Sequence, residues 1–207
     1  MKKKILQNIN PKEYENSVSE KYNNYKWMLY IGIGGLLLMF FDLTFMFAMS
    51  RTYYAEAPIK LPIVFYWNTI ILILSNIILI FVNKFYLNDN YHKYKTTLII
   101  LAATGVLFII GQMGGWAALF MSGYQLNNHY AAYLYVISAI HVLHIIGGLV
   151  FLFYFINKSF RVLKDYATSI VYFTDPIIKS QLKLFSILWY FLGAMWLYLM
   201  LFFFIMK

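Results

Sequence analysis

The 207-residue chain is 62% hydrophobic and 12% charged, with a formal net charge of +9 and no cysteine. A soluble domain carries about 25% charged residues, so the composition predicts a one-domain membrane protein. The lack of cysteine excludes disulfides, iron–sulfur clusters, c-type haem attachment and thiolate metal sites.

Residues 1–26 are polar and rich in Lys, Asn and Glu, and we expect a mobile N-terminal arm. The first apolar run starts near Trp27 and is too long for the core of a signal peptide, so we expect no cleavable signal. Residues 27–207 are expected to form a single transmembrane domain.

Five long apolar runs follow the arm, at roughly 27–50, 62–83, 96–120, 130–156 and 182–206. Each run meets the length of about 20 residues that a helix needs to cross the hydrocarbon core. Helix is the expected conformation because lipid satisfies no backbone polar groups. The predicted fold class is therefore all-α integral membrane, a bundle of five transmembrane helices. In the third run, Gly111 and Gly115 form a GxxxG pair that favours close helix packing.

The loop at about 157–181 is the only long connection, and it mixes basic with apolar residues. Two interpretations stay open: a short helix on the membrane surface, or an ordinary solvated connector.

The basic residues predict the orientation. If the N-terminus is cytoplasmic, the outer side holds only Arg51, Lys60 and Lys207 of the 17 Lys and Arg residues, and the other 14 lie inside. Cytoplasmic loops carry an excess of Lys and Arg, so the sequence predicts a cytoplasmic N-terminus and a periplasmic C-terminus. The basic residues form no stripe interleaved with base-stacking aromatics, and we expect no nucleic-acid partner.

Polar groups inside the membrane are costly, so each is a candidate functional residue. From the rise per residue, Asp42 and Gln112 lie about 12 Å from the outer ends of their helices and His141 about 16 Å, with Asn76 and His144 at about 21 Å. We expect these groups to form one buried network across the first four helices.

The two histidines allow four interpretations. Haem ligation is disfavoured, because His141 and His144 lie three residues apart on one helix and cannot take opposite faces of one haem. A metal site with Asp42 lacks a full ligand set. A structural hydrogen-bond network is the default, and a proton-related role remains open. The sequence contains no nucleophile–base set, phosphate loop or carboxylate pair that would predict catalysis. It also contains no inverted repeat of the kind that would predict a transporter, although a small transporter or assembly factor stays as the alternative of a different class.

Motifs in four helices carry a family resemblance. The strings, in chain order, are Leu61-Pro62 with Trp67-Asn68-Thr69 and Leu74-Ser75-Asn76; Gly111-Gln112 with Trp116; Ser138-Ala139-Ile140-His141-Val142-Leu143-His144 with Gly147-Gly148; and Trp189 to Leu197 with Trp196. Together they resemble subunit III of the haem-copper oxidases, the cytochrome c oxidase family, in its short five-helix form. The resemblance covers about residues 27–206.

The resemblance implies a non-catalytic accessory subunit in the bacterial cytoplasmic membrane. Its expected partners are the catalytic subunit I, other oxidase subunits, a larger respiratory supercomplex and phospholipid, with haem and copper in the partner subunits. The motif residues expected to matter are Asp42, Asn68, Asn76, Gln112, His141, His144, Trp189 and Trp196. A five-helix subunit associated with nitric oxide reductase is the alternative within the superfamily.

The chain departs from the family pattern at three places. The buried Glu of the family falls at Leu37 or Leu38, its His at Tyr190 and its Asp at Gly193. Asp42 lies about 140° around the helix from Leu37 and does not replace the missing acid. A proton-uptake role through these side chains is therefore not expected.

Overall fold

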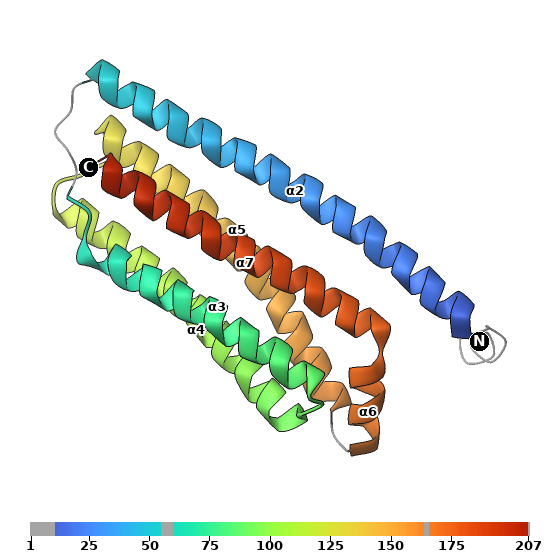
Figure 1. The fold of residues 1–207 in the computed structure, drawn as a ribbon. Helices are drawn as coiled ribbons and strands as arrows, with labels where there is room; N and C mark the ends of the chain where they lie inside the picture. The colour runs from blue at the N-terminus through green and yellow to red at the C-terminus, as the bar shows by residue number, and fades with distance from the viewer. Residues whose placement is uncertain (1–10, 55–59, 164–165, 207) are drawn as a thin grey trace.

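The computed structural model describes residues 11–54, 60–163 and 166–206. Six helices account for most of these residues and no strand occurs among them. The helices are α2 (Pro11–Tyr54), α3 (Ile63–Leu87), α4 (Tyr91–Met121), α5 (His129–Val162), α6 (Tyr166–Thr174) and α7 (Pro176–Ile205), as Figure 1 shows.

Five of the helices, all except α6, are long and apolar enough to cross a membrane. This confirms the prediction of five spans. The start of α2 and the end of α7 lie at opposite ends of the bundle (Figure 1), as an odd number of spans requires.

Helix α2 begins well before the apolar run does. Residues 11–26 of the expected arm are helical and continue directly into the first span, whereas residues 1–10 lie outside the described part of the chain. Val18 is buried in this polar part, and Lys183 lies 5.7 Å from the ring centre of Tyr22. The apolar run therefore did not predict how far the helix extends towards the N-terminus.

The bundle has three layers. Helix α2 packs on α5 and α7, which form the middle, while α3 and α4 form a tight antiparallel pair on the other side (Figure 1). The expected GxxxG packing is confirmed in this pair. A Cβ at Gly111 would lie 2.0 Å from Asn68 Oδ1, and one at Gly115 would lie 2.9 Å from the ring of Phe65.

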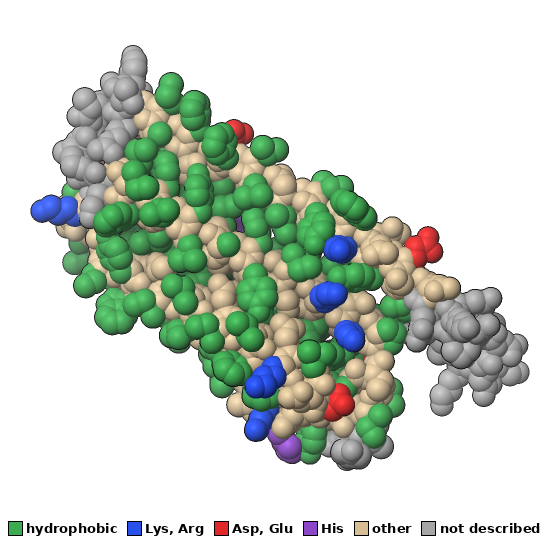
Figure 2. All heavy atoms as spheres, in the orientation of Figure 1, with side chains coloured by type: hydrophobic (Ala, Val, Ile, Leu, Met, Phe, Trp, Pro, Cys, Tyr) green, Lys and Arg blue, Asp and Glu red, His purple; other side chains and the backbone are tan. Residues whose placement is uncertain are grey.

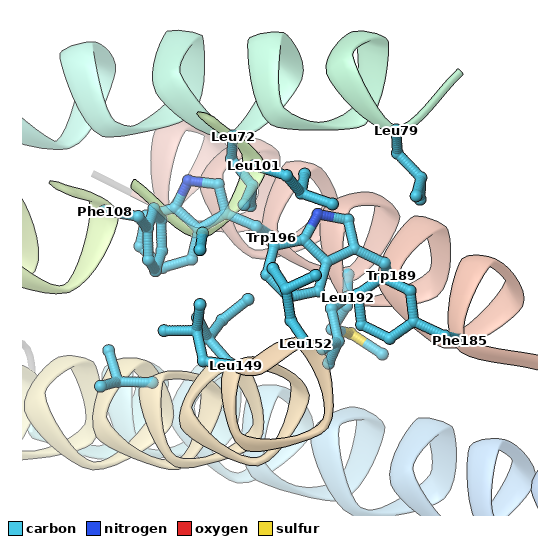
Figure 3. Close-up of a cluster of buried hydrophobic side chains, with 14 of the residues drawn as sticks. Leu72, Leu79, Leu101, Phe108, Leu149, Leu152, Phe185, Trp189, Leu192 and Trp196 are labelled. Atoms are coloured by element: carbon cyan, nitrogen blue, oxygen red, sulfur yellow. The ribbon is translucent and has the colours of Figure 1, made fainter. Parts of the chain in front are cut away.

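The core is built around two tryptophans of α7. Trp189 and Trp196 are 1% and 0% exposed. Figure 3 shows them between leucines of α3, α4 and α5, with Phe108 beside Trp196. Helix α7 packs closely against α2, α3 and α5, so these two indoles fill the centre where the layers meet.

Helix α6 lies within the long loop, so a short helix is present there, as one of the two interpretations held. The Tyr172 hydroxyl lies 3.0 Å from Ser159 Oγ and 3.4 Å from the Tyr94 hydroxyl. The Tyr86 hydroxyl donates to the Phe173 carbonyl at 3.4 Å. These bonds tie α6 to the ends of α3, α4 and α5. Its location at a membrane surface stays a prediction.

On the face shown in Figure 2, hydrophobic side chains cover much of the surface, and most of the basic side chains visible there gather towards the end where α6 lies. A basic end beside an apolar stretch is the pattern that a bilayer-spanning protein presents.

Replacing Tyr172 by Phe removes two hydrogen bonds at the buried base of α6. We expect the free energy of unfolding to fall by about 1–2 kcal/mol, the net worth of such bonds. The measurement is SDS-induced unfolding from detergent micelles, followed by tryptophan fluorescence. The control is Tyr66→Phe, since Tyr66 is 39% exposed. Equal stabilities for the two variants would contradict this account of α6.

The same tyrosine predicts a dependence on alkaline pH. Burial raises the pKa of Tyr172 above its ordinary value. The unfolded chain then loses the proton first, from about pH 10 upward, so the contribution of Tyr172 to stability is complete below about pH 10 and falls above it. We expect wild type to lose more stability than Tyr172→Phe between about pH 9.5 and 11 in the same unfolding assay. Parallel pH profiles would argue against a buried, protonated Tyr172.

Candidate functional site

The predicted site residues of α3 and α4 meet through a pair of amide side chains. Asn68 Nδ2 donates to the Phe108 carbonyl at 3.1 Å and to Gln112 Oε1 at 3.2 Å. Asn68 and Gln112 are 1% and 0% exposed. The missing side chain of Gly111 leaves the space that Asn68 occupies. This amide pair joins the two helices in their closest region.

The two tryptophans are held by hydroxyl groups of α3. Trp189 Nε1 donates to Ser75 Oγ at 3.0 Å, and Trp196 Nε1 donates to Thr69 Oγ1 at 3.1 Å. A buried indole N–H needs such a partner. The two bonds lie about two turns apart along α7 and set its height against α3.

Glycines receive the Trp189 ring on the opposite side. A Cβ at Gly105 of α4 or at Gly148 of α5 would lie 3.2 Å from atoms of that ring. The six-membered ring of Trp189 is therefore wedged between two helix backbones while its N–H faces a third helix. Gly148 and Trp189, which belong to two different motifs, therefore form one contact.

Asn76 lies directly on Gly193. A Cβ at Gly193 would lie 2.0 Å from Asn76 Nδ2, whereas Asn76 Oδ1 has no hydrogen-bond partner. The family pattern places Asp where this chain has Gly193. The small residue leaves room for the amide of α3, so in this chain the polar group at this contact comes from the opposite helix.

His141 is fully buried among aromatic rings. Its ring centre lies 5.2 Å from that of Trp196, 5.8 Å from Phe108 and 6.3 Å from Phe40. Neither ring nitrogen has a hydrogen-bond partner within the structure. His141 therefore packs as an aromatic residue at the junction of α2, α4, α5 and α7.

His144 and Asp42 stand apart from this junction. His144 Nδ1 lies 2.7 Å from the Ile140 carbonyl of its own helix, and its ring lies 6.0 Å from Phe40. Asp42 is exposed on α2. No hydrogen bond or ion pair among the described residues joins Asp42 to either histidine. The structure therefore brings Asn68 and Gln112 together but does not connect all five polar groups into the single network that the sequence predicted, because the histidine and Asp42 side chains point to different surroundings.

Hydroxyl and amide groups within the apolar runs supply contacts that the sequence interpretation missed. The Thr44 and Tyr198 hydroxyls lie 2.8 Å apart and join α2 to α7. Trp116 Nε1 donates to Ser138 Oγ at 2.9 Å and joins α4 to α5. The sequence prediction considered mainly ionisable residues, whereas Ser, Thr and Tyr also form hydrogen bonds across membrane helices.

The contacts described above are packing contacts and hydrogen bonds between helices. Among the residues that the structure describes, no three His, Asp or Glu side chains gather in a way that would hold a metal ion. His141 and His144 project from α5 three residues apart, a spacing that does not place them on opposite faces of one haem.

A scan against protein-family models and a search of curated proteins give no match to this chain. The resemblance to oxidase subunit III therefore rests on the motif residues alone.

Replacing Gly111 by Ala tests the amide pair. The new Cβ would displace Asn68 from its two bonds, and we expect a loss of about 2 kcal/mol in the free energy of unfolding. Gly147→Ala is the control, because nothing lies within 4 Å of a Cβ there. The control is expected to be neutral or more stable by about 0.5–1 kcal/mol.

A double-mutant cycle identifies the cause. In an Asn68→Ala background the Gly111→Ala change should cost little, since the side chain it displaces is gone. The same cost in both backgrounds would show that the loss comes from elsewhere in the α3–α4 interface. SDS titration with circular dichroism measures all five proteins.

Proposed function

We propose that this chain is a non-catalytic accessory subunit of a haem-copper terminal oxidase of the cytochrome c oxidase type. It packs on the catalytic subunit I in a bacterial cytoplasmic membrane, within a complex that includes other oxidase subunits and associates with a larger respiratory assembly. Its role is to support stable electron transfer to O₂ and the accompanying proton translocation.

One observation carries the proposal. The four motifs that resemble subunit III occur in order, one on each of α3, α4, α5 and α7. At least one residue of each motif is buried close to Trp189 and Trp196, whereas Trp67 and Leu143 are 60% and 64% exposed. Asn68, His141 and Trp196 all lie within this core and are at most 1% exposed. Residues scattered by chance among apolar helices would face lipid as often as one another. Their convergence supports a shared fold.

We assign haem and copper to the partner subunits. Asn68, Trp189 and Trp196 hydrogen-bond to neighbouring helices and His141 packs against aromatic rings, so these side chains hold helices together. The expected contribution to the oxidase is therefore mechanical: a rigid bundle, held by buried indoles and amides, that covers and stabilises part of the catalytic subunit.

Phospholipid is a proposed ligand of the bundle. A groove of about 510 Å³ runs between α2 and α7, lined by Leu37, Leu38, Phe41, Phe191, Ala194, Met195 and Tyr198. The lining is nearly all apolar and suits an acyl chain. The buried Glu of the family falls at Leu37 or Leu38, so the groove offers lipid contact without an acid for proton uptake.

The proposed orientation places α6 and the basic end in the cytoplasm. We expect a membrane-impermeant maleimide to label Asn127→Cys, between α4 and α5, in intact cells, and to label His92→Cys, at the start of α4, only after the membrane is opened. The chain has no cysteine to interfere. The reverse pattern would contradict the proposed topology.

The proposed function itself is tested by purifying the tagged chain in mild detergent and recording the reduced-minus-oxidised haem spectrum with copper analysis. Co-purification of a-type haem with copper is the expected result. Haem of b and c type without copper would instead indicate the nitric oxide reductase branch. A colourless, homogeneous preparation would reject both and favour a transporter or assembly factor.

A further inference from the structure

Asp42 is an acidic residue on the face of α2 that is exposed rather than packed against the other helices. It lies eight residues before Ser50, where the first candidate span ends, so about 12 Å of apolar helix separates it from that end. It is the only acidic residue of α2 after Glu20. Hydrophobic side chains make up much of the visible surface over this helix (Figure 2).

The side chain points away from its own bundle. Phe40 and Thr44 are buried, at 1% and 2% exposure, and each lies two residues from Asp42, close to half a turn around the helix. The residues that share the outer face of Asp42 are large and hydrophobic: Leu38, Phe45 and Met49 are 66%, 53% and 56% exposed. No hydrogen bond or ion pair to Asp42 is found among the described residues.

A carboxyl group in this position requires a partner. Acidic side chains at membrane depth face a bundle interior or a watery cavity and pair with other groups, because lipid tails offer no hydrogen bonds. The short Asp side chain cannot reach the headgroup region as Lys and Arg do. A lipid acyl chain would cover the surrounding leucine and phenylalanine, but it cannot satisfy the acid.

Three glycines of α2 suggest that a helix packs over the face that contains Asp42. Gly32, Gly34 and Gly35 lie on the same helix with open space beside their Cα atoms, and none packs against this chain. Gly35 precedes Asp42 by seven residues, which is two turns, so both lie on one face. Small residues let a second helix approach closely, and an approach at Gly35 brings that helix within reach of the carboxyl group.

The partner is a different chain rather than a second copy. A two-fold contact through this face would bring two Asp42 side chains together, and like charges oppose such pairing. Of the 17 Lys and Arg residues only Lys183 falls within the five apolar runs, at the inner end of the last one, so a second copy has no basic residue to present at the depth of Asp42.

We propose that the outer face of α2 centred on Asp42 is the docking surface for a membrane-spanning helix of another protein, which supplies a Lys or Arg to the carboxyl group. The inference deepens the proposed function, on which it rests for the existence of a partner subunit. It does not depend on the partner being an oxidase.

The test places a photocrosslinking amino acid at Phe45, beside Asp42, in the full-length chain in its native membrane. A matched probe at Leu107, which is 52% exposed on α4, reports on the opposite side of the bundle. Both probes are placed in wild type and in Asp42→Leu, and crosslinked peptides are sequenced by mass spectrometry. Gel filtration and circular dichroism verify that Asp42→Leu folds, as expected for an outward-facing residue.

The expected result is a crosslink from position 45 to an apolar segment of another protein that contains Lys or Arg. Its yield should fall by about fivefold in Asp42→Leu, as loss of an interhelical polar contact implies, while the pattern from position 107 stays unchanged. Crosslinks from position 45 to lipid only, to a second copy of this chain, or to a protein with unchanged yield in Asp42→Leu would each overturn the inference. A dependent crosslink to a protein without haem would support the docking surface and reject the oxidase proposal.

Discussion

Helices in a bilayer gain little by hiding apolar side chains from one another, because lipid tails are as apolar as leucine. Association then depends on how closely the backbones approach and on the polar bonds that this approach permits. In this chain the decisive contacts are places where a bulky side chain of one helix enters the space above a glycine of another. Asn68 lies on Gly111, Trp189 lies against Gly148, and Asn76 lies on Gly193. The three-layer bundle depends on these contacts.

The glycine contacts explain why the motif residues belong together. Each of these three side chains also carries a polar group, and that group finds a partner on a neighbouring helix in two of the cases: Asn68 bonds to Gln112, and Trp189 bonds to Ser75. Removing the small residue would therefore disturb packing and hydrogen bonding at once. An accessory subunit that must keep its shape while a neighbouring subunit turns over would gain from this coupling.

The sequence predicted much of the fold because hydrophobic length is a strong signal in membranes. The five spans and the GxxxG contact of α3 and α4 followed from it. The helical part of the arm did not, since residues 11–26 are polar and their helix is an extension of α2 that contacts α7 at Val18 and Tyr22. The short helix α6 stayed one of two interpretations, because its docking depends on Tyr172 meeting Tyr94 and Ser159 from distant parts of the chain.

The sequence predicted which residue types lie in the candidate site, but not which of their side chains contact one another. Asn68, Gln112 and the two tryptophans lie in the core, as polar groups at membrane depth were expected to do. Which groups meet depends on the rotation of each helix, which hydropathy does not report. Asp42 illustrates the limit: its depth suggested a buried network, yet its position around α2 directs it outward, away from His141.

The central claim is that this chain stabilises an oxidase without taking part in its chemistry. The most direct measurement is oxygen uptake by membranes from cells that lack the chain, normalised to haem a content and followed over many turnovers. The account predicts an initial rate per haem close to that of wild type, followed by an accelerated decline as turnover proceeds, with restoration when the chain is supplied again. Oxygen uptake that stays as high and as lasting as in wild-type membranes would contradict the account.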